Sequence, residues 1–101
     1  MLRILQIFIF YSSITSVIFS QGVSLSGYVT GSDNGRVTGA TITIGGTTLG
    51  TVTDKNGFYK INKIKPGTYV LRVSYLGFET LERQAEINNE VTHFDFCIRE
   101  S

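Results

Sequence analysis

Apolar and polar residues alternate in short runs from residue 23 to the end of the chain. A period of two residues turns one side of a run toward a core and the other toward water, which is typical of β-strands. No window carries a sustained helical period. Seven strands are therefore expected, over Val23–Thr30, Ala40–Ile44, Thr48–Thr53, Phe58–Ile61, Tyr69–Tyr75, Phe78–Ile87 and Thr92–Arg99.

Clusters of turn-forming residues separate these runs, at Gly31–Gly35, Asp54–Gly57 and Lys65–Gly67. A positive φ is expected at Gly57 and at Gly67, because each closes a turn at a strand junction. Short strands about 8–12 residues apart predict an all-β fold, a seven-stranded β-sandwich. Packing one sheet on another would bury six large side chains, Phe58, Tyr69, Leu71, Val73, Phe94 and Phe96.

The first twenty residues differ in character from the rest. Arg3 precedes the apolar run Ile4–Phe10, a second apolar run covers Val17–Phe19, and the small residue Ser20 ends it. This order predicts a Sec signal peptide over residues 1–20 and a domain over residues 21–101. The alternative is an uncleaved membrane anchor, which needs about 20 mostly apolar residues. Four hydroxyl residues interrupt this stretch, Ser12, Ser13, Thr15 and Ser16.

Charge and composition exclude several functions. The 9 Lys and Arg residues nearly balance the 8 Asp and Glu residues, so neither nucleic acid nor an anionic membrane surface is an expected partner. The single cysteine, Cys97, cannot form a disulfide within the chain, and with one histidine no dense metal site is expected. His93 and Asp95 alternate outward, but no serine lies in a nucleophile motif. We therefore expect no enzyme, no metal and no cofactor.

Five segments together resemble one family, in this order: Ser26–Val29, Gly39–Ile44, Gly50–Tyr59, Ile64–Tyr69 and Val73–Glu79. Their combination resembles the carboxypeptidase regulatory-like domain over about Val23 to Ile98. The resemblance implies a prealbumin-like or immunoglobulin-like sandwich of seven strands. A familiar setting of this domain is the amino-terminal extension of SusC-like TonB-dependent outer-membrane receptors, directly after the signal peptide. In those receptors a plug and a β-barrel follow, whereas this sequence ends at Ser101.

Three functions are compatible with this resemblance. The first is a non-catalytic accessory domain of TonB-dependent nutrient uptake, located in the periplasm and touching the outer membrane only through a protein partner. The second is a stand-alone secreted module that binds glycan or peptide; Tyr28, Tyr59 and Tyr75 are candidates for its aromatic platform, although Tyr75 also suits the core. The third is a regulatory appendage of a zinc carboxypeptidase, which no preceding catalytic domain supports.

One segment is a candidate for binding a protein partner. Four of the eight positive charges that remain after leader removal fall within eleven residues. Such a cluster would attract an acidic partner and lose strength with salt. The alternative is a solvated strand edge whose lysines prevent edge-to-edge pairing. The candidate residues are Lys55, Asn56, Lys60, Lys63 and Lys65.

Overall fold

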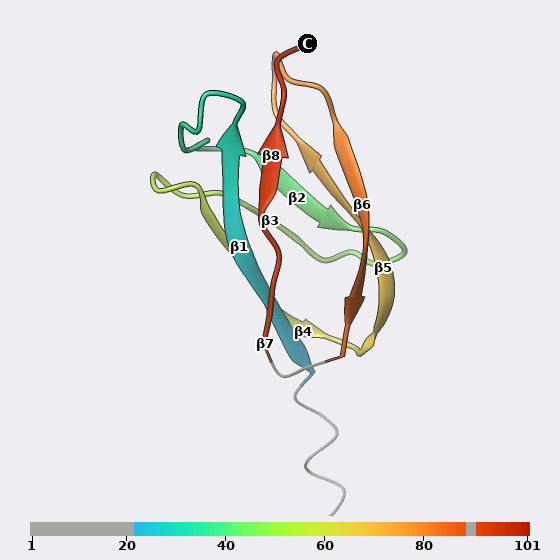
Figure 1. Cartoon of the computed structure of the whole chain (residues 1–101). Coiled ribbons are helices and arrows are strands. Elements are labelled where there is room, and N and C mark those ends of the chain that lie inside the picture. The colour runs from blue at the N-terminus through green and yellow to red at the C-terminus, as the bar shows by residue number, and fades with distance from the viewer. Residues whose placement is uncertain (1–21, 89–90) are drawn as a thin grey trace, which may run out of the picture.

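A computed structural model describes residues 22–88 and 91–101 of the chain, so the predicted leader lies outside the described residues. Figure 1 shows a sandwich of two sheets, with the start of the first strand at one end of the molecule and Ser101 at the other. No helix in the described ranges is long and apolar enough to cross a membrane. The strands are β1 (Val23–Gly31), β2 (Thr41–Ile44), β3 (Gly50–Val52), β4 (Phe58–Ile64), β5 (Gly67–Ser74), β6 (Leu81–Ile87), β7 (Val91–His93) and β8 (Phe96–Ile98).

The two sheets differ in how their strands run. The first has the order β4-β1-β7, with β8 also paired to β1. In this sheet β1 is antiparallel to β4 but parallel to both β7 and β8. The second sheet has the order β3-β2-β5-β6 and is antiparallel throughout. β4 and β6 are therefore edge strands of different sheets.

The core lies between the sheets and is filled by alternate residues of the strands. Leu25 and Val29 of the first sheet face Ile42, Leu71 and Val73 of the second, and all five are fully buried. The expected burial is confirmed for three of the six large side chains, Leu71, Val73 and Phe96.

The expected core is wrong by one residue in β4. Tyr59, and not Phe58, is the buried aromatic residue, because Tyr59 pairs with Gly27 on the inner side while Phe58 pairs with Tyr28 on the outer side. Tyr69 and Phe94 are only partly buried at the margin of the core.

The last predicted strand is interrupted, which gives eight strands instead of seven. The Phe94 N–H still donates to the Ser26 carbonyl at 2.8 Å, but the next bond is made by a side chain, since the Tyr28 N–H donates to the Asp95 carboxylate at 2.8 Å. The hydroxyl of Tyr59 donates to the Phe94 carbonyl. Gly27 allows this approach, because a Cβ there would lie 2.0 Å from the Phe94 oxygen.

Two further expectations need correction. The sixth strand begins at Leu81 and not at Phe78, because the segment before it is a turn in which the Phe78 N–H donates to the Tyr75 carbonyl at 3.0 Å. The positive φ expected at Gly57 is confirmed at 73°, whereas Gly67 has no positive φ and begins β5. The left-handed residue near that turn is Lys63, with φ 62°.

Candidate functional site

The five candidate partner-binding residues are exposed and follow a single edge strand. Lys55 and Asn56 lie in the β3–β4 turn, Lys60 lies within β4, Lys63 lies near its end, and Lys65 lies in the β4–β5 turn. We call these five residues the basic edge. A strand of seven residues is about 20 Å long, so they form a row along the molecule and not a compact patch.

The turn that carries Lys55 and Asn56 is held by Asp54. Its carboxylate accepts the N–H groups of Asn56 at 2.8 Å and Phe58 at 3.0 Å, and its carbonyl accepts the N–H of Gly57 at 2.9 Å. This arrangement is an Asx turn, in which an aspartate side chain replaces a backbone acceptor. Asp54 is therefore a structural residue that fixes where Lys55 projects.

Lys63 lies in a β-bulge at the other end of the strand. Val23 and Leu25 of β1 are two residues apart, but their partners Ile64 and Ile61 in β4 are three apart. The extra residue adopts a left-handed conformation at Lys63. Bulges of this kind bend an edge strand and limit further pairing at that end.

The lysines of the basic edge have no acidic partner within the described ranges. The ion pair found there joins Arg72 to Glu82 at 3.9 Å, on the second sheet. All four lysines of the chain belong to the basic edge. Their charge is therefore directed to solvent or to another molecule.

A partly exposed aromatic pair borders the basic edge on the outer face of the first sheet. The rings of Tyr28 and Phe58 meet edge to face, with their centroids 5.3 Å apart. The guanidinium of Arg36 lies 4.4 Å from the centroid of the Tyr28 ring. Two register positions along, on the same face of the sheet, Lys60 lies opposite Ser26, whose other neighbour is His93. Alternation predicts that Tyr28 points outward, but it does not predict this cluster, because Phe58 and Arg36 come from other segments.

His93 and Ser26 form a contact that the sequence did not suggest. The Ser26 hydroxyl oxygen lies 3.1 Å from Nδ1 of His93. Nucleophilic catalysis needs a base that is itself oriented by a third group. The nearby Asp95 carboxylate instead accepts the Tyr28 N–H.

Asp95 also affects a buried phenol. Burial raises the pKa of Tyr59 well above its ordinary value, and the negative charge of Asp95 raises it further. Tyr59 therefore stays neutral and donates its proton to the Phe94 carbonyl. The candidate platform of Tyr28, Tyr59 and Tyr75 is thus wrong for Tyr59, which is 1% exposed, while Tyr28 and Tyr75 are 39% and 38% exposed.

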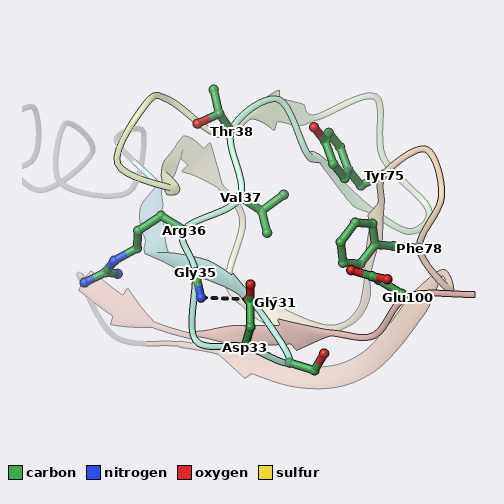
Figure 2. Close-up of a pocket in the computed structure, with 10 residues that line it drawn as sticks. Gly31, Asp33, Gly35, Arg36, Val37, Thr38, Tyr75, Phe78 and Glu100 are labelled. Atoms are coloured by element: carbon green, nitrogen blue, oxygen red, sulfur yellow. Dashed lines mark hydrogen bonds between the residues drawn. The ribbon is translucent and has the colours of Figure 1, made fainter.

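A second candidate site lies at one end of the sandwich, where loops meet around a cavity of about 340 Å³. We call it the end pocket. Figure 2 shows Tyr75 and Phe78 together on one wall, the β1–β2 loop on the other, and Val37 between them. Ligand pockets in proteins usually start at about this volume. The lining residues are Gly31, Ser32, Asp33, Gly35, Arg36, Val37, Thr38, Tyr75, Phe78 and Glu100.

Local bonding holds the residues of the end pocket in place. Gly77 has φ 87° in the Tyr75–Phe78 turn, and the rings of Tyr75 and Phe78 pack with centroids 5.5 Å apart and planes at 51°. Phe78 and Glu100 form an isolated antiparallel bridge, which brings their side chains to the same side. The carboxylate of Asp33 accepts the Gly35 N–H at 2.9 Å.

Sequence reasoning did not find the end pocket. Its three contributing segments are far apart in the chain, and none of them carries a binding motif. Tyr75 was a candidate for an aromatic platform, but with Tyr28 and Tyr59 and not with Phe78, whose segment entered only through the family resemblance. Within the described residues no group of three or more metal-binding side chains occurs, in this pocket or elsewhere.

Comparison with solved structures defines the class of protein. A chain in the type II cohesin–X-dockerin complex of Acetivibrio cellulolyticus shares 24% identity, with a TM-score of 0.68 over 78% of this chain and 58% of that chain. The Bacillus anthracis TIE protein gives 0.66 at 16% identity, over 80% of this chain and 17% of that one. The 3-chlorocatechol 1,2-dioxygenase of Rhodococcus opacus gives 0.59 at 13% identity, over 79% and 60%. The fold is that of the immunoglobulin-like β-sandwich domains.

Sequence comparison then gives the family. The model of the CarboxypepD_reg-like domain matches residues 25–101, and the chain belongs to this family. The resemblance noted from its motifs is confirmed. No curated protein matches the chain in sequence. Because this fold occurs in an enzyme as well as in a cohesin–dockerin complex, its function has to be argued from its surface.

Proposed function

We propose that the protein is a non-catalytic interaction domain of the cell envelope, which docks onto an acidic segment of a partner protein through its basic edge. The observation that carries this proposal is the row of lysines along β4, exposed and without an ion pair among the described residues. An edge strand can pair with a further strand from a partner. Opposite charges on the two proteins would orient the partner and raise the rate of association.

Two features of the surface support docking at this edge. The Tyr28–Phe58 pair and Arg36 lie beside it, and tyrosine and arginine are enriched among the residues that contribute most to protein interfaces. Membership of the CarboxypepD_reg-like family and likeness to a chain of a cohesin–dockerin complex also favour an interaction domain.

The proposed setting is the periplasm, beside a TonB-dependent receptor of the outer membrane. The signal-peptide pattern of residues 1–20 and the family resemblance support this setting. The domain would act there as an accessory to nutrient uptake. The competing proposal is a stand-alone secreted module for glycan or peptide, and the end pocket is the feature that favours it.

Cross-linking in the native host tests the proposal. A photo-activated amino acid in place of Lys60 should join the domain to an outer-membrane protein, and the same group in place of Arg83 on β6 should not. Both positions are exposed strand residues, so a product at Lys60 alone would show specific docking at β4 and not random collision with a nearby protein. Equal products at both positions, or none at either, would contradict docking through β4.

A pair of charge reversals provides the matched control. Lys60→Glu with Lys65→Glu and Arg83→Glu with Arg99→Glu change the net charge by the same amount on different elements. Only the lysine pair should abolish capture, by the otherwise unmodified domain in a pull-down from envelope extract, of the protein that cross-links at position 60, and raising salt should weaken capture by the wild type. If neither pair changes capture but the lysine pair lowers monomer solubility, the basic edge serves only to prevent aggregation.

A further inference from the structure

The end pocket combines an aromatic wall with carboxylates at its rim. Tyr75 is more than one-third exposed, and its ring packs against that of Phe78 with centroids 5.5 Å apart and planes tilted by 51°. The two rings in contact form one extended apolar wall, which suits an alkyl chain lying along it. A flat sugar ring instead needs a single open aromatic face.

The charge at the pocket is negative. Asp33 and Glu100 both line it, and the Phe78–Glu100 bridge places the side chains of Phe78 and Glu100 on the same side, where both line the pocket (Figure 2). The third charged residue, Arg36, extends away from the cavity and stacks on Tyr28. No hydrogen bond or ion pair within the described ranges involves the Glu100 side chain. Asp33 uses one oxygen within its own loop.

We propose that the end pocket binds the cationic side chain of a lysine or arginine in an extended peptide. The alkyl part of that side chain would lie along the open side of the Tyr75–Phe78 pair. Its charged end would meet Glu100 and Asp33, since cations are attracted both to aromatic faces and to carboxylates.

Leu76 extends the site beyond the pocket. It is 96% exposed at the tip of the turn between the two aromatic residues. Exposed leucines are common when isolated, but this one lies in the turn whose Tyr75 and Phe78 line the pocket. It would contact an apolar residue next to the lysine or arginine of the peptide. The ligand class is therefore a peptide segment with adjacent apolar and basic residues.

Nuclear magnetic resonance titration of the exported protein tests this proposal. The probe is a blocked tetrapeptide with one leucine and one lysine, and its control has norleucine in place of lysine. The lysine peptide should shift the amide signals of residues 31–38, 75–78 and 99–101, and the norleucine peptide should bind several-fold more weakly. Equal binding of both peptides, or shifts confined to other regions, would overturn the proposal.

Three variants locate the interaction. Glu100→Gln and Tyr75→Leu should each weaken binding about three- to fivefold, because each removes one of the contacts with the cation. Asp33→Asn should weaken it while keeping the acceptor for the Gly35 N–H. Glu82→Gln, which removes a carboxylate on β6, should leave binding unchanged. Unchanged amide spectra away from the substitutions would show that each variant is folded.

Binding of a sugar in place of the lysine peptide is the alternative result that would contradict the proposal. If an oligosaccharide such as maltotriose shifts the same signals and the lysine peptide does not, the pocket is a glycan site and the proposal is wrong. The test is independent of the proposed docking edge, because the variant with Lys60→Glu and Lys65→Glu should bind the lysine peptide as the wild type does.

Discussion

Single residues explain much of what stabilises this sandwich, and Tyr59 is the clearest case. Its ring is buried against Phe96, with centroids 5.9 Å apart, while its hydroxyl reaches the Phe94 carbonyl at the break between β7 and β8. Tyr59→Phe should lower the free energy of unfolding by about 1–2 kcal/mol at neutral pH, because the carbonyl loses its donor. Chemical denaturation measures this loss, and an unchanged value would show that water replaces the hydroxyl.

The raised pKa of Tyr59 predicts how stability changes in alkali. The unfolded phenol titrates near pH 10, whereas the folded phenol holds its proton to a higher pH because of burial and Asp95. Stability from this residue is therefore complete below about pH 10 and is lost as the pH rises above it. The wild type should lose stability more steeply between pH 9.5 and 11 than Tyr59→Phe, in parallel denaturation series.

Turn glycines provide a second residue-scale prediction. A Cβ at Gly57 would lie 2.8 Å from the Val29 oxygen, and its φ of 73° is unfavourable for other residues. Gly57→Ala should therefore cost about 1–2 kcal/mol. Gly67→Ala is the control, because that residue has no positive φ and its Cβ would meet the Tyr69 ring at 3.4 Å. Equal melting temperatures for the two variants would contradict this account.

The two glycines also show how far local sequence predicts geometry. The Asp54–Gly57 turn depends on its own residues, since the Asp54 carboxylate bonds within the loop, and the sequence predicted it correctly. The second turn was misread, because the left-handed residue there is Lys63. Its conformation comes from a bulge in the pairing of β4 with β1. Pairing of this kind involves a strand more than thirty residues away and leaves no local signal.

At the scale of elements, the period of two predicted the strands and most of their inward faces. The period of two did not predict the interruption between β7 and β8, because inward and outward residues keep alternating across it in the same order. β1 residues 24–26 pair with 91–93 and residues 29–31 with 96–98, so the register is the same on both sides of the break. The ladder is interrupted by a side chain, Asp95, and by the absence of one at Gly27.

The break between β7 and β8 gives an element-scale prediction. Gly27→Ala should destabilise the fold by at least about 2 kcal/mol, because the new Cβ would overlap the Phe94 carbonyl. Asp95→Asn is a milder change that keeps an acceptor for the Tyr28 N–H. Thermal unfolding followed by circular dichroism compares them. A Gly27→Ala protein as stable as Asp95→Asn would mean that the break can move at little cost.

At the scale of the whole molecule, the basic edge was predictable and the end pocket was not. The lysines are close in sequence and lie in one strand and its two flanking turns, so a charge count finds them. The end pocket needs Asp33, Tyr75 and Glu100 to meet, and only the tertiary fold brings these loops together. The pattern of apolar and polar residues therefore does not reveal compact sites built from distant segments, even where it predicts most of the strands.

Processing of the whole chain remains a prediction. The leader pattern predicts that export removes residues 1–20 and leaves Gln21 or a close neighbour first. Amino-terminal sequencing of the exported protein measures the cleavage site directly. Material that retains Met1 in a membrane fraction would support the alternative of an uncleaved anchor.

The parallel pairing of β1 with β7 and β8 limits when the domain can fold. β1 is the first strand of the described chain, yet one of its two neighbours is supplied by residues 91–93 and 96–98. During synthesis, or during passage through a membrane channel with the amino terminus first, β1 cannot complete its pairing until residues 91–98 are available. Contacts so distant in sequence also make folding slow. The sandwich can therefore close only after residues 91–98 have emerged.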